Sequence, residues 1–245
     1  MIIEGLSIKT TSVCQRLCKY CSVLPWMRNN PGYHMDVADI ESLVEMSHKH
    51  GLEWGYILLS GGEPLLWKNL KEGVRKLNAG KITKNITLLT NALAVRRQNV
   101  DDFAEVVENV NYFKISRYAD QQQAISIDII RGRYGNTGKI LVEDRMERLV
   151  PPSKPISFEG SADCACRAYS VVMGKIDSCG PSRTIVADRF VRPGLQTAGE
   201  PKYTIGIDCF YNYFITNPKD RFNIEECKWC VANRKIWPSL NRLIE

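Results

Sequence analysis

Three of the nine cysteines stand close together near the start of the sequence, in the run Cys14-Gln-Arg-Leu-Cys18-Lys-Tyr-Cys21. Thiolates at this spacing can converge on a single metal centre. Structural zinc usually takes four protein ligands, whereas a four-iron cluster held by three cysteines leaves one iron open to bind another molecule. Neither cysteine nor histidine follows within the next dozen residues. The spacing therefore favours a catalytic cluster, and a zinc site completed by a distant residue is the alternative.

A glycine pair followed by a glutamate forms a second group, Ser60-Gly61-Gly62-Glu63-Pro64, directly after an apolar stretch that is typical of a strand. Paired glycines let the backbone approach a ligand closely. The carboxylate of Glu63 can accept a hydrogen bond from an ammonium group. On its own such a sequence usually forms only a turn, so its meaning depends on the cysteines that precede it.

The other six cysteines all lie in the last third of the chain: Cys164, Cys166, Cys179, Cys209, Cys227 and Cys230. Cys227-Lys-Trp-Cys230 has the spacing of a metal knuckle, for which zinc is the usual ion. Cys209 lies in an apolar stretch and is more typical of a buried structural cysteine, although a ligand or a hydrogen-atom donor is an alternative. The N-terminus has no secretory signal, and cytosolic thiols stay reduced, so metal binding is expected rather than a disulfide framework.

The elements that must position these groups alternate between strands and helices, which is typical of repeated β-α units around a parallel sheet. Strands are predicted at Glu4–Thr10, Tyr56–Ser60, Asn85–Thr90, Tyr112–Ser116 and Lys139–Val142. Helices are predicted at Asp36–His50, Leu65–Leu77, Asp101–Glu108 and Ala119–Ile130. This is too few units for a closed eight-stranded barrel. The expected fold class is therefore α/β, with an open, partial (β/α) barrel.

A proline cluster at 151–155 cannot continue a helix and predicts a linker. It divides the chain into a barrel over residues 1–150 and a small cysteine-rich domain over residues 151–245. Within the second domain, Arg167–Val172 and Lys175–Ser178 predict a hairpin that ends at Cys179.

Composition excludes several classes of protein. The net charge of +6 is spread along the chain without a basic arm, so nucleic acid is not supported as a partner. No apolar run approaches the roughly 18 residues that cross a bilayer. A cytoplasmic protein with no membrane partner is expected.

Taken together, the two N-terminal motifs resemble those of the radical S-adenosylmethionine (SAM) superfamily. The spacing Cys-x3-Cys-x2-Cys with an aromatic residue before the third cysteine is similar to its cluster loop, and Gly61–Pro64 is similar to the motif that contacts the methionine amino group of SAM. The resemblance implies that Cys14, Cys18 and Cys21 hold a catalytic [4Fe-4S] cluster. It implies a set of cofactor-binding residues at the loop and at the strand ends: Tyr20, Gly61, Gly62, Glu63, Pro64, Asn91, Ser116 and Arg117.

The chemistry that this resemblance implies is specific. In the family, one electron from the cluster cleaves SAM to methionine and a 5′-deoxyadenosyl radical, which abstracts a hydrogen atom from an unactivated C–H bond. A reductase or a flavodoxin-type protein is the implied electron donor. The protein positions the cofactor and excludes water.

The C-terminal cysteines are similar to those of the SPASM/Twitch subgroup, because Cys164-x9-Gly174-x4-Cys179 matches the opening of its auxiliary-cluster motif. With only one Cys-x2-Cys pair the chain departs from the full SPASM pattern. The shorter Twitch type implies one auxiliary [4Fe-4S] cluster, with the ligands Cys164, Cys179, Cys227 and Cys230. Cys166 competes with Cys164 for the first ligand position.

In size the chain is similar to the 2-deoxy-scyllo-inosamine dehydrogenases, short Twitch enzymes that oxidise an aminocyclitol alcohol. This similarity favours a two-electron oxidation of a small molecule. Modification of a peptide, or an epimerisation, is the alternative within enzymes, although no leader-binding domain precedes the first predicted strand. A zinc-stapled interaction module is the non-enzymatic alternative. No pattern assigns the substrate contacts. Tyr33, His34 and Trp26–Arg28 follow the cluster cysteines and Arg131–Tyr134 lie near the fifth predicted strand, but such residues more often form packed or solvated surface.

Overall fold

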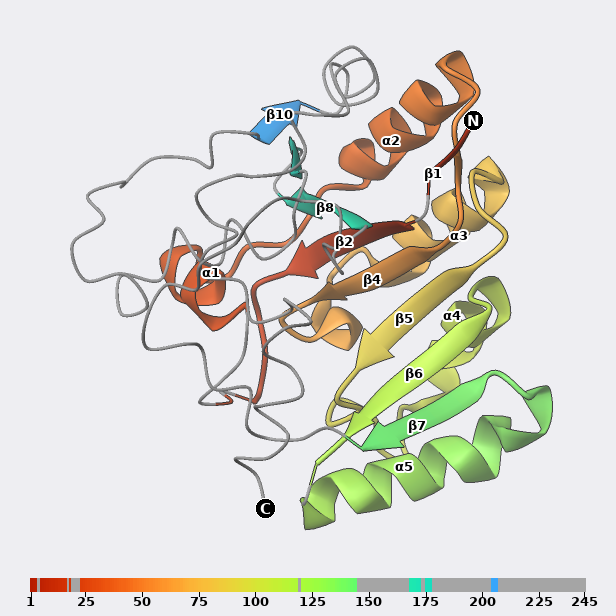
Figure 1. Ribbon diagram of the computed structural model, residues 1–245. Coiled ribbons are helices and arrows are strands. Elements are labelled where there is room, and N and C mark those ends of the chain that lie inside the picture. The colour runs from red at the N-terminus through yellow and green to blue at the C-terminus, as the bar shows by residue number, and fades with distance from the viewer. Residues whose placement is uncertain are drawn as a thin grey trace, which may run out of the picture.

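The computed structural model describes residues 1–3, 5–16, 18, 23–118, 120–144, 168–172, 175–177 and 204–206. These residues build one large sheet with helices along it (Figure 1). Five of its parallel strands follow one another in chain order: β2 (Gly5–Thr11), β4 (Ile57–Gly61), β5 (Ile86–Thr90), β6 (Tyr112–Arg117) and β7 (Ile140–Asp144). All five predicted strands are therefore confirmed to within about two residues at each end.

The sheet continues beyond β2 on its other side. Strand β8 (Ala168–Val172) pairs parallel to β2, β9 (Lys175–Asp177) pairs antiparallel to β8, and β10 (Thr204–Gly206) pairs antiparallel to β9. The predicted hairpin is thus confirmed, and it extends the sheet of the barrel. The predicted domain boundary at residue 150 lies outside the described residues.

Helices fill the connections between the parallel strands. They are α2 (Val37–Lys49), α3 (Leu70–Gly80), α4 (Ala104–Asn109) and α5 (Gln121–Tyr134), and Figure 1 shows them following one another along the outer side of the sheet. A short helix, α1 (Leu24–Asn29), lies in the segment that follows the cysteine loop. No helix among the described residues is long and apolar enough to span a membrane.

The core between sheet and helices follows from the alternation of side chains along the strands. On β2, Leu6 and Ile8 are buried, as are Ile57 and Leu59 on β4, and their partners continue the layer on β5 and β6. Leu43 of α2 and Leu77 of α3 close this layer from the helical side. The core holds the strands in a fixed register, so that their carboxyl ends meet along one edge.

Several details differ from the sequence prediction. Neither α1 nor β10 was predicted, α4 begins three residues later than the predicted helix, and α5 ends four residues later. The predicted helix Leu65–Leu77 begins instead at Leu70, because Pro64–Leu66 form a 3-10 turn and Trp67 is extended. The Glu63 side chain caps this turn by accepting from the N–H of Leu65. Two strands of two residues each, β1 (Ile2–Ile3) and β3 (Glu53–Trp54), pair in a small parallel sheet that was not predicted. Strands this short have no periodicity that a sequence pattern can detect.

Candidate active site

Most of the predicted site residues that the structure describes come together at the carboxyl edge of the parallel strands. Cys14 follows β2, Glu63 follows β4, Asn91 follows β5 and Ser116 is the last residue but one of β6. Open parallel sheets bind their ligands at this edge, because the connecting loops there leave side chains from several strands facing one point. The strand order therefore brings together residues that are about 100 positions apart in the sequence.

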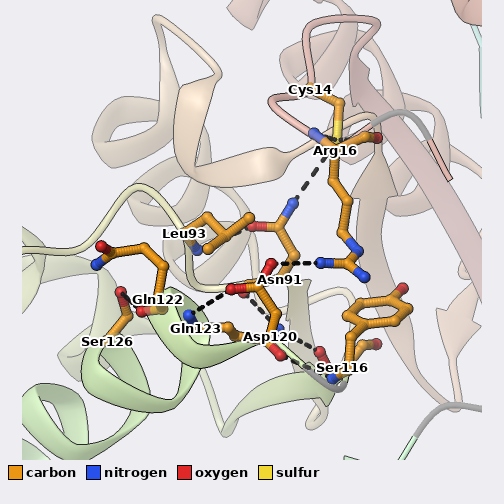
Figure 2. A network of polar contacts seen from close by, with 10 residues as sticks. Cys14, Arg16, Asn91, Leu93, Ser116, Asp120, Gln122, Gln123 and Ser126 are labelled. Carbon is orange, nitrogen blue, oxygen red and sulfur yellow. Dashed lines mark hydrogen bonds and ion pairs between the residues drawn. The ribbon is translucent and has the colours of Figure 1, made fainter.

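Cys14 is held at this edge by polar contacts to its sulfur atom. The backbone N–H of Arg16 donates to Cys14 Sγ at 3.3 Å, and the side-chain amide of Asn91 donates to it at 3.6 Å (Figure 2). Cys14 and Cys18 are both reduced and partly exposed. The Cys14 sulfur also lies 3.2 Å from the Arg16 carbonyl oxygen. Cysteine binds iron as its thiolate. These two residues therefore fit a cluster, while Tyr20 and Cys21 lie outside the described residues.

The glycine pair packs against the backbone of the cysteine loop. The N–H of Gly62 donates to the Thr11 carbonyl at 2.6 Å, and the N–H of Glu63 donates to the Val13 carbonyl at 2.7 Å. A Cβ atom on Gly62 would lie 2.4 Å from the Val13 oxygen, and Gly61 has a φ of 129°, which disfavours any side chain. The glycines are thus needed for a close approach between two loops. Contact of Gly61, Gly62 and Pro64 with SAM remains a prediction.

Glu63 is almost fully buried, with 1% of its surface exposed, and three donors surround its carboxylate. Leu65 N–H and the Thr90 hydroxyl donate to Oε1 at 3.0 and 2.5 Å, and Asn91 N–H donates to Oε2 at 2.7 Å. Burial raises the pKa of Glu63 to about 7, against the effect of these three hydrogen bonds, which lower it. Glu63 therefore links the ends of β4 and β5, and its predicted contact with the ammonium group of SAM would use the remaining lone pairs of the same carboxylate.

The Glu63→Gln variant should bind SAM about tenfold more weakly and should lose part of the pH dependence of stability. In either orientation of the glutamine amide, its nitrogen would face a backbone N–H, that of Asn91 or that of Leu65, and one hydrogen bond would be lost. In the folded wild-type protein the pKa of Glu63 is about 7, whereas in the unfolded chain its pKa is 4.5, so the folded protein holds this proton to a higher pH. The contribution of Glu63 to the free energy of unfolding therefore falls as the pH rises from the unfolded to the folded pKa, by at most about 3 kcal/mol.

Denaturant unfolding at pH 5 and pH 8, together with SAM titration, measures both effects. Glu41→Gln is the matched control, because Glu41 is an exposed glutamate paired with Lys76 on the helical side. If Glu63→Gln and wild type had equal SAM affinity and an equal pH dependence of the free energy of unfolding, this carboxylate would not contribute to the site.

A buried glutamine on α5 connects the ends of β5 and β6. Gln123 Nε2 donates to the carbonyl oxygens of Asn91 and Ser116, both at 2.7 Å, and its Oε1 accepts from Tyr118 N–H at 2.7 Å. Figure 2 shows Gln123 below Asn91 and beside Ser116. Sequence analysis did not identify this residue. The only signal was the run Asp120-Gln-Gln-Gln123, which is similar to a helix capping box and places Gln123 in the first turn of α5.

Arg117 differs from the other predicted cofactor residues in its surroundings. Its guanidinium forms a two-pronged ion pair with Asp144 at the end of β7, with distances of 2.5 and 2.8 Å. Both side chains are largely exposed, and the pair holds the pKa of Asp144 below its ordinary value. A contact between Arg117 and the carboxylate or ribose of SAM remains a prediction, and this ion pair would compete with it.

Tyr33, His34 and the segments Trp26–Arg28 and Arg131–Tyr134, the candidates for substrate contact, mostly pack against or pair with other residues of the described part of the chain. Trp26 and Met27 are buried, and the Trp26 ring meets Tyr33 edge to face with centroids 5.8 Å apart. His34 Nδ1 lies 3.2 Å from the Thr11 hydroxyl. Arg133 of the segment Arg131–Tyr134 pairs with Asp101 at the far end of α5. Cys164, Cys166, Cys179, Cys209, Cys227 and Cys230 lie outside the described residues.

Comparison with known proteins agrees with this geometry. Residues 8–147 match the family model described as the radical SAM superfamily. The probable GTP 3′,8-cyclase of Methanocaldococcus jannaschii is 30% identical over 134 residues, which are 51% of this chain and 44% of that protein. The GTP 3′,8-cyclase of Pelotomaculum thermopropionicum is 35% identical over 92 residues, 37% of this chain and 28% of that protein. The chain thus matches less than half the length of these relatives.

Among solved structures, that of BtrN in complex with AdoMet and 2-DOIA has a similar fold, with a TM-score of 0.52. The likeness covers 72% of both chains at 17% sequence identity. At this identity the similarity establishes the shared fold alone. It agrees with the α/β core whose parallel strands form part of a barrel.

Proposed function

Because the chain belongs to the radical SAM superfamily, we propose that it binds SAM and a [4Fe-4S] cluster at the edge formed by Cys14, Glu63 and Asn91. Cys14, Cys18 and Cys21 would hold the cluster, and Gly61–Pro64, Asn91, Ser116, Arg117 and Tyr20 would surround the cofactor. When bound, the cluster and SAM supply a 5′-deoxyadenosyl radical that abstracts a hydrogen atom from the substrate. Support comes chiefly from the contact of Asn91 with Cys14, which joins a proposed cofactor residue to a proposed ligand.

The residues of the chain would contribute position and polarity. Glu63 fixes the backbone of Asn91, and Gln123 fixes its carbonyl group, so the Asn91 amide stays aimed at the Cys14 sulfur. The Gly62 contact with the Val13 carbonyl sets the height of the cysteine loop above β4. Such preorganised donors lose little freedom when a ligand binds. The site is thus rigid on the side of β4 and β5.

For the reaction itself we propose a two-electron oxidation of a small molecule. The support is the similarity of the C-terminal cysteine spacing to Twitch enzymes, which implies an auxiliary [4Fe-4S] cluster held by Cys164, Cys179, Cys227 and Cys230. After hydrogen-atom abstraction and loss of a proton, this cluster would accept the remaining electron from the substrate radical. A reductase or flavodoxin-type protein would supply the separate electron that cleaves SAM. The alternative is a redox-neutral reaction, such as an epimerisation or the modification of a peptide.

Changing Cys227 and Cys230 together to alanine tests the oxidation. Iron should be lost selectively from the C-terminal part of the chain, and SAM cleavage without substrate should continue, because the catalytic ligands are Cys14, Cys18 and Cys21. Substrate oxidation should fall by at least about 100-fold, since no acceptor remains near the substrate radical. Iron analysis, 5′-deoxyadenosine and product are measured on the same anaerobic preparation.

Folding of this variant must first be checked by circular dichroism, because cysteine-rich units often depend on their metal. A well-folded variant without the second cluster that still forms the full amount of product would contradict an oxidation. Incorporation of solvent deuterium into that product would then identify a redox-neutral epimerisation.

A further inference from the structure

Arg16, the second residue after Cys14, connects the cysteine loop to the junction between β6 and α5. Its Nη1 lies 2.8 Å from Asp120 Oδ2, and its guanidinium lies 4.1 Å from the centre of the Tyr118 ring. The side chains of Arg16 and Asp120 are only 19% and 29% exposed. Figure 2 shows the Arg16 side chain extending from the loop of Cys14 down to Asp120. The contact therefore joins two segments that are 104 residues apart.

Asp120 is itself held in place by the helix that it begins. Its Oδ1 accepts from the N–H of Gln123 at 3.0 Å and caps α5, while Oδ2 accepts from Arg16. The backbone hydrogen bonds lower the pKa of Asp120, and so does the Arg16 charge, so the carboxylate stays ionised. Gln123 in turn fixes Asn91 and Ser116. Arg16 is thus attached to the same rigid group of residues that surrounds the proposed cofactor.

The other side of Arg16 meets the cysteine loop. Its guanidinium forms a hydrogen bond with the Cys18 side chain, and its backbone N–H donates to Cys14 Sγ at 3.3 Å. A guanidinium presents several donors in a fixed plane, so it can bind a sulfur and a carboxylate at once and stack on an aromatic ring.

From these contacts we infer that Arg16 is a positioning residue, which clasps the cluster loop to Asp120 and Tyr118 and places a fixed positive charge beside the Cys18 sulfur. The inference rests on the proposed role of Cys14, Cys18 and Cys21 as cluster ligands. The clasp holds the described start of this loop, Cys14 to Arg16, in place and therefore slows loss of the cluster. The charge makes the reduced cluster, which carries one more electron, easier to form.

The experiment compares Arg16→Gln, Asp120→Ser and the double variant as iron-loaded proteins. Serine keeps a hydroxyl that can cap α5 but is too short to reach Arg16, so the helix start is preserved. A chelator is added anaerobically, and the electron paramagnetic resonance signal that responds to SAM is followed, because it reports on the catalytic cluster alone. Each single variant should lose this signal about tenfold faster than wild type, and the double variant should be no faster than either.

The midpoint potential of the same cluster separates the charge from general stability. The midpoint potential should fall in Arg16→Gln, which removes the positive charge. It should not fall in Asp120→Ser or Arg16→Lys, because both variants keep that charge. Arg16→Lys should lose the signal at an intermediate rate, since it retains the charge but not the planar fork. Arg133→Gln is the matched control, because it breaks an Arg–Asp pair at the other end of α5, and it should behave as wild type.

The clasp would be overturned if Arg16→Gln and Asp120→Ser lost the signal at the wild-type rate. It would also be overturned if their two increases in rate multiplied in the double variant, or if Arg133→Gln lost the signal faster than wild type. An unchanged midpoint potential in Arg16→Gln would overturn the role of the charge. A wild-type protein without any SAM-responsive signal would instead contradict the proposed function. The two failures are therefore distinguishable.

Discussion

Replacement of Cys14, Cys18 and Cys21 together by alanine is expected to abolish SAM cleavage. These residues would supply all three protein ligands of the catalytic cluster, and Cys14 lies beside Asn91 at the carboxyl edge of the strands. Roughly half of the iron should remain, since four-iron clusters are bound by their own sets of thiolates and the C-terminal set is unchanged. The measurements are iron content after reconstitution and 5′-deoxyadenosine after addition of SAM and a reductant.

The triple variant must be compared with wild type by circular dichroism, so that loss of cleavage is not confused with loss of the fold. The barrel core is formed by the sheet and α2 to α5, and the described cysteines are not part of it. A normal spectrum is therefore expected. If the folded triple variant still forms 5′-deoxyadenosine, these cysteines do not hold the catalytic cluster.

Substitution of Gly62 by alanine should have the second largest effect. The added Cβ would lie 2.4 Å from the Val13 oxygen and 2.8 Å from the Val13 carbonyl carbon, distances that non-bonded atoms do not tolerate. The neighbours are backbone atoms, so they cannot move aside by a change of rotamer. Overpacking of this kind costs about 1–3 kcal/mol. Because the displaced backbone leads directly into Cys14, we expect cluster binding to fall at least about tenfold as well.

Gly132→Ala is the matched control for this substitution. Gly132 lies in α5, where an added Cβ meets no atom within 4 Å. Alanine there should raise the free energy of unfolding by about 0.5–1 kcal/mol, since glycine is a poor helix former. Chemical denaturation and iron content are measured for both variants. A Gly62→Ala protein as stable and as rich in iron as wild type would show that the two loops need not approach this closely.

The sequence contained enough information to predict the strands and the position of the site. Alternating or continuous apolar residues identify β2, β4, β5, β6 and β7, because burial on the core side repeats with the period of a strand. Once the strands are parallel and in order, their ends must meet, so Cys14, Glu63, Asn91 and Ser116 fall at one edge. The apolar periodicity of the strands, together with the rule that parallel sheets bind ligands at their carboxyl edge, was sufficient to place the site.

The contacts within the site could not be predicted in the same way. Arg16 and Asp120 are 104 residues apart, and no local pattern pairs them. Gln123 has a polar side chain in the first turn of a helix, a position usually exposed to solvent, yet it is fully buried between the ends of β5 and β6. The engagement of Arg117 by Asp144 likewise depends on the pairing of β6 with β7. These features depend on tertiary packing.

The most direct test of the central claim is metal analysis and SAM cleavage on the wild-type protein after anaerobic purification. We expect a brown protein with about eight irons, no stoichiometric zinc, and release of 5′-deoxyadenosine when SAM and a strong reductant are added. Zinc in stoichiometric amount, with no 5′-deoxyadenosine formed, would contradict the central claim.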